Sequence, residues 1–368
     1  MKITTVGIDL AKSVLQIHGV DERGKVAVRK QLKRSEVLSY FANLEPCVIG
    51  MEACGSAHHW ARKLREFGHT VKLMSPQFVK PYVKTNKNDV VDAEAICEAV
   101  SRPTMRYVPV KTVEQQAILS VHRARAGFVK ARTAQGNQIR GLLSEFGIVI
   151  SQGIHSIVKR MPEILEDGEN GLPGTMRSLV QRLTENIKEM DRQVEELEKQ
   201  IQLWHREHEA SRRLAQIPGV GPITASAMVA TVGKAREFKN GRQLAAWMGL
   251  VPKQNSSGGK QNLLGISKRG DTYLRTLLIH GARSVIHHVE NKPEGSSWLR
   301  RLMARRNKNV AAVALANKNA RTIWALLAHG ARDDIDPAAG RKSGDDANGL
   351  GGICVRSRGG NYAACRGQ

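Results

Sequence analysis

The N-terminal fold is set by residues 3–20, ITTVGIDLAKSVLQIHGV. A largely apolar run from Ile3 to Ile8 predicts a buried strand, and Asp9 follows that run directly. A second run, Val14–Val20, predicts another strand, and residues 25–32 predict a third after a short polar turn. The pattern therefore indicates a three-strand meander with a carboxylate at the end of its first strand.

Three more carboxylates fall where they can join Asp9. Glu52 follows another apolar run, and Asp89 and Asp92 stand three residues apart at the start of a helical pattern. Residues at that spacing share one face of a helix. Two strand ends and one helix face can converge on a hard cation, and Mg²⁺ takes oxygen ligands of this kind and bridges to phosphate. The sequence predicts one catalytic Mg²⁺ site, made of Asp9, Glu52, Asp89 and Asp92.

The order of the elements supports this site. After the meander, a helix, a strand, a helix, a strand and a helix are expected at residues 35–42, 47–51, 57–67, 71–74 and 89–101. The order β-β-β-α-β-α-β-α, with acids on strand 1, strand 4 and the last helix, is the layout of an α/β RNase H-like (RuvC-like) fold. We expect this domain to span residues 1–108. Each acid taken alone also has a simpler interpretation. Asp89, for example, would serve as the N-cap of its helix, an interaction that stabilises a helix by about 1 kcal/mol.

The chain is strongly basic. It has 57 Lys and Arg residues against 34 Asp and Glu, a formal net charge of +23, which favours a polyanionic partner, either nucleic acid or an anionic membrane surface. No apolar run approaches the roughly 20 residues that span a bilayer, so we expect nucleic acid and no membrane. The sequence shows no signal peptide, so we expect a cytoplasmic protein. Its five cysteines form no CxxC pair, so we expect no zinc site.

A basic helix and a heptad pattern occupy residues 109–210. The pattern at 113–146 predicts one long helix, on which Arg125 and Arg132 are candidates for phosphate contacts. A solvated charged face is an equally good interpretation. Residues 176–204 then repeat apolar positions at the 3.5-residue spacing of a coiled-coil seam. This seam favours a homo-oligomer, although an intrachain hairpin with the preceding basic helix would also fill it.

A mainly helical domain with a helix-hairpin-helix element is predicted at residues 211–332. The element is IPGVGPIT, residues 217–224, where Gly219 and Gly221 would let the backbone approach a phosphate at the start of the next helix. An ordinary tight turn between packed helices is the alternative. Residues 333–368 are Gly- and Asp-rich without an apolar period, so we expect a disordered tail there.

A polar Ser-Gly loop, VPKQNSSGGK at residues 251–260, is predicted to be exposed and mobile. Taken alone, such a segment is most often a linker. The cations in and after this loop are expected to contact phosphates, setting affinity without reading sequence. These residues are Lys253, Lys260, Lys268, Arg269 and Arg275.

Several blocks of this sequence resemble the DEDD transposases of bacterial insertion sequences, also described as bridge-RNA-guided recombinases. The blocks are GIDLAK, MEACGSAHHWAR, NKNDVVDAEAI, IPGVG, and VPKQNSSGGK with GISKRGDTYLRTLL, in the family's order over roughly residues 1–330. The resemblance implies a RuvC-like domain whose four acids, matched here by the four named above, bind Mg²⁺. It also implies a nucleophilic serine in a flexible Ser-Gly loop. We place this role on Ser257, directly before Gly258, with Ser256 as the alternative.

By this resemblance the protein is a transposase that cleaves and exchanges DNA strands with Mg²⁺, through a covalent link to Ser257. Element ends and target would be its DNA partners, a non-coding RNA its guide, and a dimer or tetramer its assembly; direct reading of DNA is equally compatible with the residues. Two other functions stay open. A structure-selective RuvC-like nuclease would use only the four acids and a metal-activated water. A regulator would carry an inactive catalytic domain, but all four acids are present.

Overall fold

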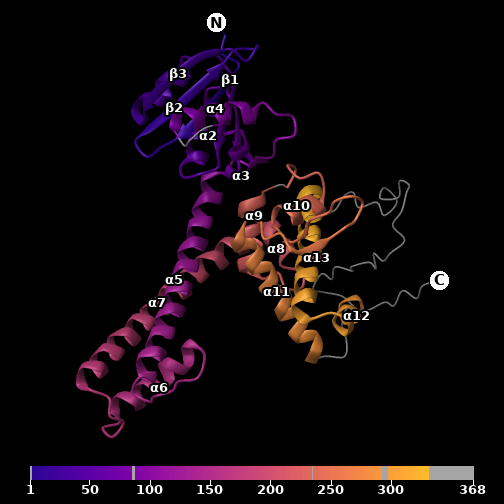
Figure 1. Ribbon diagram of the computed structural model, residues 1–368. Helices are drawn as coiled ribbons and strands as arrows, with labels where there is room; N and C mark the ends of the chain where they lie inside the picture. Colours follow the sequence, from indigo (N-terminus) through magenta and orange to yellow (C-terminus); the bar gives the residue numbers. More distant parts are fainter. Residues whose placement is uncertain (1, 85–87, 234, 292–296, 331–368) are drawn as a thin grey trace, which may run out of the picture. The chain divides into compact units, whose positions relative to one another are not determined.

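The computed structural model describes residues 2–84, 88–233, 235–291 and 297–330. They form two compact units, which we describe separately (Figure 1). Unit 1 runs to Glu207 and also includes Ser226–Lys239, whereas unit 2 comprises His208–Ala225 and the described residues from Asn240 onward. The regions predicted as 1–108 and 109–210 thus share one unit, and the return of residues 226–239 to it was not predicted. The predicted tail lies outside the described residues.

A six-stranded mixed sheet forms the N-terminal part of unit 1. Its strand order is β3-β2-β1-β4-β5-β6. The meander β1-β2-β3 is antiparallel, β4 and β5 continue from β1 in parallel, and β6 is antiparallel to β5. The strands are β1 Thr5–Leu10, β2 Val14–Val20, β3 Val26–Lys33, β4 Val48–Glu52, β5 Thr70–Met74 and β6 Tyr107–Val108. The predicted meander and the strand that ends at Glu52 are confirmed within one or two residues, and β6 was not predicted.

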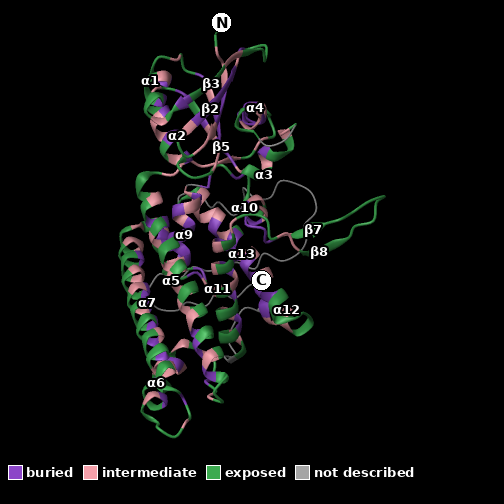
Figure 2. Ribbon diagram, turned by 60° about the vertical axis from the view of Figure 1, so that its left-hand side comes forward, coloured by how far each residue is buried: buried purple, intermediate pink, exposed green. Residues whose placement is uncertain are grey.

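Helices cover both faces of this sheet (Figure 2). Val6 and Ile8 of β1 belong to a core shared with the first two helices. Gly7, between them, faces the other side, where the last helix of the domain lies against β1, β2 and β4. The helices are α1 Val37–Ala42, α2 Ala57–Glu66, α3 Pro76–Val79 and α4 Asp89–Val100, with short 3₁₀ turns at Arg34–Glu36 and Lys80–Tyr82.

Helix α4 approaches the sheet more closely than a side chain would allow. A Cβ at Gly7 would lie 2.2 Å from the carbonyl oxygen of Ala93, and a Cβ at Gly50 on β4 would lie 2.7 Å from Cβ of Val100. The α4 backbone at Gly7 and the Val100 side chain at Gly50 therefore leave room only for glycine at these two positions. Because α4 carries two of the predicted ligands and β1 carries a third, this contact sets their separation.

A long helical hairpin makes up much of the rest of unit 1 (Figure 1). Helices α5 (Val113–Ser144) and α7 (Gly174–Glu207) pack along each other, with α6 (Ile154–Glu166) in their connection. Ile139 of α5 and Ile187 of α7 are fully buried in one core. The predicted heptad seam is therefore filled by α5 of the same chain. The alternative of an intrachain hairpin thus accounts for the buried positions of the seam, and the seam by itself no longer indicates a dimer.

Unit 2 is built on two long helices, α11 (Thr272–Asn291) and α13 (Lys308–His329), which pack against each other. The short helices α10 (Gly241–Trp247) and α12 (Ser297–Arg305) both pack on α13. Leu278 of α11 is among the fully buried residues. None of the described helices, in either unit, is long and apolar enough to cross a membrane.

The segment predicted as a helix-hairpin-helix has a packing role. It connects α8 (Glu209–Leu214) with α9 (Pro222–Val232), a helix that begins in unit 2 and ends in unit 1. A Cβ at Gly219 would lie 2.7 Å from the carbonyl oxygen of Gly281 on α11, whereas a Cβ at Gly221 would meet nothing within 4 Å. Close packing against α11 thus accounts for glycine at position 219 without a phosphate contact. This agrees with the alternative of an ordinary tight turn between packed helices.

Replacing Gly7 by alanine tests the packing of α4 on β1. The added methyl group would overlap the α4 backbone, so we expect Gly7→Ala to lower the free energy of unfolding by about 1–3 kcal/mol or more. The control is Gly127→Ala on α5, where a Cβ meets nothing within 4 Å and alanine favours the helix by roughly 1 kcal/mol. Urea unfolding followed by circular dichroism measures both variants. A Gly7→Ala midpoint at or above that of the wild type contradicts the packing.

Candidate metal centre and serine hairpin

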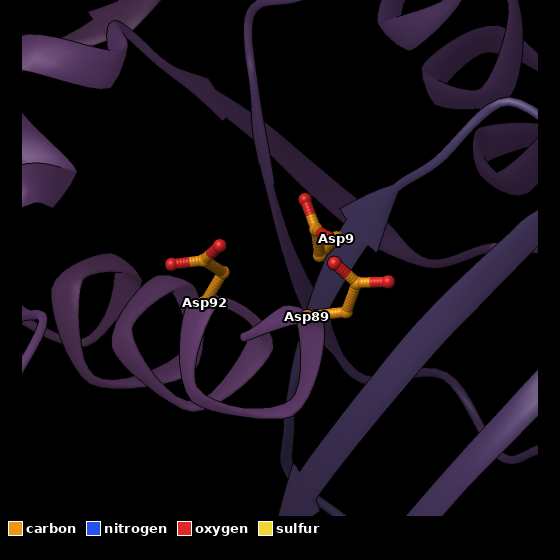
Figure 3. A group of neighbouring side chains, drawn as sticks. All are labelled: Asp9, Asp89 and Asp92. Carbon is orange, nitrogen blue, oxygen red and sulfur yellow. The ribbon is translucent and has the colours of Figure 1, made fainter. Parts of the chain in front are cut away.

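Three of the four predicted acids lie together in unit 1 (Figure 3). Asp9 is near the end of β1, and Asp89 and Asp92 are in the first turn of α4. One carboxylate oxygen from each lies within 4.8 Å of those of the other two. Asp89 is exposed and the other two are half-buried, so solvent reaches the group. We call these three residues the candidate metal centre.

The start of α4 leaves its carboxylates available. Asn88 is the N-cap, and its side-chain oxygen accepts a hydrogen bond from the backbone N–H of Val90 at 3.0 Å. The alternative in which Asp89 is the cap is therefore wrong. Both aspartates instead sit where the positive end of the helix dipole favours negative charge, which offsets part of their mutual repulsion.

Glu52 stands beside the candidate metal centre but is not one of its three members. In the parallel pair β1–β4, Ile8 is opposite Met51, so the next residues, Asp9 and Glu52, are neighbours on adjacent strands. Partial desolvation, and then the charges of Glu52 and Asp9, raise the pKa of the Cys54 thiol. The sheet register thus brings the fourth acid to the same strand ends as Asp9.

The candidate metal centre fits a hard divalent cation. Carboxylates this close repel one another unless positive charge lies between them. Mg²⁺ is bound through one or two carboxylates while keeping water or phosphate in its other positions, and Mn²⁺ also suits carboxylate and water ligands. All donors of the group are oxygens, and the exposed Asp89 keeps the group open to solvent.

His58 is a poor candidate for a further ligand, because both of its ring nitrogens lie within hydrogen-bond distance of Lys111. Burial, and then the positive charges of Lys111, Arg62 and Arg123, lower its pKa to about 4. Its Nδ1 accepts a hydrogen bond from the backbone N–H of Lys111 at 3.2 Å. His58 is therefore a neutral imidazole that joins α2 to the start of α5.

Ser257 lies at the tip of a two-stranded hairpin in unit 2. Strands β7 (Pro252–Gln254) and β8 (Leu263–Ile266) pair antiparallel and form what we call the serine hairpin, residues 252–266, which Figure 2 shows as largely exposed. The pairing reaches the tip, where Ser257 and Lys260 form a bridge. The predicted Ser-Gly loop is exposed as expected, but it forms a β-hairpin and not an irregular loop.

A tight turn closes this hairpin. The N–H of Lys260 donates to the carbonyl oxygen of Ser257 at 3.0 Å, and the two residues between them, Gly258 and Gly259, have φ of 54° and 78°. A two-residue hairpin turn with positive φ at both central positions strongly favours glycine there. The Gly-Gly pair is thus explained by the turn itself.

The hairpin has two different faces because side chains alternate along its strands. Ser257 shares one face with Lys253 and Lys260, all three of them exposed. Ser256 is on the other face, and its Oγ accepts a hydrogen bond from the backbone N–H of Asn262 at 3.2 Å. The two serines therefore differ in their charged surroundings.

Arg125 and Arg132, both predicted to contact phosphate, have partners inside unit 1. Nε of Arg125 donates to Glu198 of α7 at 2.8 Å, and Arg132 pairs with Asp191 of the same helix. Both arginines are half-buried and join α5 to α7. We therefore withdraw them from the phosphate-contacting set, because their charges are neutralised within the hairpin.

Arg275 also has a structural role. Only 8 % of it is exposed, and it donates to the carbonyl oxygen of Met248 at 3.0 Å and to the hydroxyl of Thr272 at 3.1 Å. It satisfies a carbonyl at the end of α10, one of the groups a helix leaves unpaired. The phosphate contact predicted for Arg275 is corrected on this ground. Lys268 and Arg269, by contrast, are exposed.

A basic surface that the predicted residues did not include lies on α12. Arg301, Arg305 and Arg306 at its end are exposed, while Leu299 is buried and anchors the helix. No Asp or Glu occurs in residues 297–330. The signal available from the sequence was this absence of acids around an arginine-rich helix.

Family comparison decides what the chain is. A transposase model of the DEDD type, named for IS110, matches residues 6–148, and the model for the transposase IS116/IS110/IS902 family matches residues 211–300. The chain belongs to this family of insertion-sequence transposases. It is 54% identical over 329 residues to a probable family 20 transposase of Pseudomonas aeruginosa, covering 89% of this chain and 97% of that protein.

Two further relatives are insertion-sequence transposases by name. The transposase for IS1111A of Coxiella burnetii is 47% identical over 326 residues, which is 88% of this chain and 90% of that protein. The transposase for IS1328 of Yersinia enterocolitica is 41% identical over 329 residues, or 89% and 98%. As a member of this family, the transposase cleaves and joins DNA, and DEDD transposases generally use a divalent metal ion. The candidate metal centre lies within the first family match and the serine hairpin within the second.

Removing one carboxylate tests whether the candidate metal centre holds a cation. Without added metal, Asp92→Asn should raise the thermal midpoint, because it relieves repulsion between like charges. Added Mg²⁺ or Mn²⁺ should raise the wild-type midpoint, because the ion binds the folded state, and raise that of Asp92→Asn much less. Glu185→Gln, which removes an exposed acid of α7, is the control and should follow the wild type. Equal metal-dependent shifts in Asp92→Asn and the wild type would refute the site.

Proposed function

We propose that this transposase exchanges DNA strands in a Mg²⁺-dependent reaction in which Ser257 is the nucleophile. The observation that carries the proposal is the candidate metal centre, whose carboxylate oxygens lie within 4.8 Å of one another. When bound there, Mg²⁺ would act as a Lewis acid on the scissile phosphate. Glu52, beside Asp9 on the next strand, completes the proposed set of four ligands.

The sheet supports the same chemistry. Its first five strands have the order 3-2-1-4-5, with the meander antiparallel and β1, β4 and β5 parallel. Carboxylates stand at the end of the central strand and on the helix that packs over it. RNase H-like nucleases have this arrangement, and we assign the catalytic domain, residues 1–108, to that fold.

In the proposed reaction, Oγ of Ser257 attacks the scissile phosphorus. The Oγ–P bond forms as the P–O3′ bond breaks, and the serine proton passes to the departing 3′ oxygen. A phosphoserine ester and a free 3′-hydroxyl result. The 3′-hydroxyl of a second DNA then attacks the phosphoserine, which joins the strands and returns the proton to Ser257. One ester bond replaces another in each step, so no external energy source is needed.

The hairpin supports Ser257 over Ser256 as the nucleophile. Ser257 shares its face with two exposed lysines, which would hold the phosphate that it attacks. The Oγ of Ser256 already accepts a backbone hydrogen bond. Lys268 and Arg269, which follow β8 in the sequence and are also exposed, extend the proposed phosphate-contacting surface. These contacts would set affinity and leave the choice of sequence to another element.

The remaining partners follow from the resemblance to guided transposases. We propose DNA ends and target as substrates, a non-coding RNA as the guide, and a homo-oligomer, dimer or tetramer, as the working form. The heptad seam no longer supports the oligomer, since α5 fills it within one chain. The exposed arginines of α12 add a cationic surface that suits either nucleic acid.

A cleavage assay separates the serine reaction from hydrolysis. With element-end DNA, guide RNA and Mg²⁺, we expect the wild type to give a covalent protein–DNA band on a denaturing gel. Ser257→Ala should abolish it because the nucleophile is lost, and Asp9→Ala because the metal site is lost. Ser256→Ala is the matched variant and should keep the band. Cleavage that survives Ser257→Ala without a covalent band would assign the protein to a nuclease that uses metal-activated water.

Salt dependence tests the phosphate contacts. Neutralising Lys260 should weaken binding to all DNA sequences alike and reduce the slope of log K against log salt by about one unit, because one counterion fewer is released. Lys188→Ala removes an exposed lysine from α7 and should leave the slope as in the wild type. Fluorescence anisotropy with duplexes of unrelated sequence measures both. If Lys260→Ala lost affinity for one sequence alone, Lys260 would instead be a base reader.

A further inference from the structure

The serine hairpin leaves two leucines largely exposed in the described structure. Leu263 is 60% exposed and Leu264 is 49% exposed, and they are adjacent residues of β8. Among the residues that the structure describes, this sheet consists of β7 and β8 alone, and no third strand pairs with β8. Two-stranded hairpins with so little burial are marginal in water, which points to a surface that is covered in the working complex.

The two leucines lie on opposite faces of the hairpin. Leu263 is opposite Gln254, so the next residue, Leu264, stands opposite Lys253 where the register shifts. Counting in steps of two from the bridge at Lys260 also brings Leu264 to the face that carries Ser257. Four residues of strand place it roughly 13 Å from Lys260 along this face.

The charge around Leu264 selects its partner. Residues 251–270 contain four lysines and arginines and no Asp or Glu. A protein surface that buried Leu264 would have to bury or neutralise these cations as well, whereas nucleic acid offers phosphates to the cations and apolar base faces to the leucine. The face of Ser257, Lys253, Lys260 and Leu264 therefore matches a DNA strand, backbone and bases together.

We propose that Leu264 is a wedge that inserts between base pairs of the DNA held on the Ser257 face and unstacks them near the scissile phosphate. Apolar side chains of DNA-binding proteins open base steps in this way. The inference rests on the proposed function of Ser257, and it supplies a step that strand exchange needs: a cleaved strand must leave its complement before it can join another. Leu264 is a positioning residue. Lys253 and Lys260, by binding phosphates, fix the position along the DNA at which Leu264 inserts.

Fluorescence of 2-aminopurine tests the wedge, because this base brightens when it is unstacked. The probe is a short duplex with 2-aminopurine at several positions, titrated to saturation with the full-length protein. We expect the wild type to raise the fluorescence and Leu264→Ser to reduce that rise by about half or more, since the inserting apolar group is gone. Leu264→Met, which keeps volume and polarity, should restore most of it. Leu263→Ser makes the same change on the opposite face and is the control, expected to behave as the wild type.

The outcomes separate this inference from the serine mechanism. Ser257→Ala removes the covalent link but should retain unstacking, so each idea can fail while the other stands. An equal rise in Leu264→Ser and the wild type at saturation overturns the wedge. So does an equal loss in both leucine variants, which would mean general damage to the hairpin. If Leu264→Ser shifted the oligomeric state in size-exclusion chromatography while unstacking persisted, the leucine would contact protein and not DNA.

Discussion

The candidate metal centre depends on the contact between the backbone of α4 and the backbone of β1 at Gly7. No side chain fits between the two, since a Cβ at Gly7 would lie 2.2 Å from the Ala93 carbonyl oxygen. Asp92 directly precedes Ala93, and Asp89 is one helical turn earlier. Asp9 is two residues beyond Gly7. Because a helix and a strand are both stiff, docking them at this point holds the carboxylates within the narrow tolerance that metal binding requires.

Electrostatics makes this arrangement costly until a cation arrives. Three carboxylates within 4.8 Å repel one another, and the fold limits that cost in two ways. Asn88 takes the capping role at the start of α4, so neither aspartate is diverted to the backbone. The dipole of α4 also places partial positive charge beside Asp89 and Asp92. The residual repulsion is the driving force for taking up a divalent ion.

Local sequence patterns predicted the helices and strands of this fold, whereas the contacts between distant residues became known only from the structure. Apolar runs gave β1 and β4, and the i, i+3 spacing put Asp89 and Asp92 on one helix face. The heptad pattern showed that α7 needs a partner helix but not which chain supplies it, and α5 does. Arg275 looked like a free cation because no sequence pattern reveals the Met248 carbonyl that it satisfies. The interpretations of the seam and of Arg275 changed for the same reason. A sequence does not show which distant residue of the same chain will pair with a given apolar face or charged group.

The turn at Gly258 and Gly259 determines which serine faces the lysines. A two-residue turn fixes the hairpin register, with the N–H of Lys260 bound to the carbonyl of Ser257. A slip by one residue would exchange the two faces and put Ser256 where Ser257 now lies. Positive φ at both glycines is what selects this register, so the two glycines determine which serine shares a face with the lysines. The proposed choice of Ser257 over Ser256 as the nucleophile therefore depends on this turn, and so do the positions of Lys253, Lys260 and Leu264 on the hairpin.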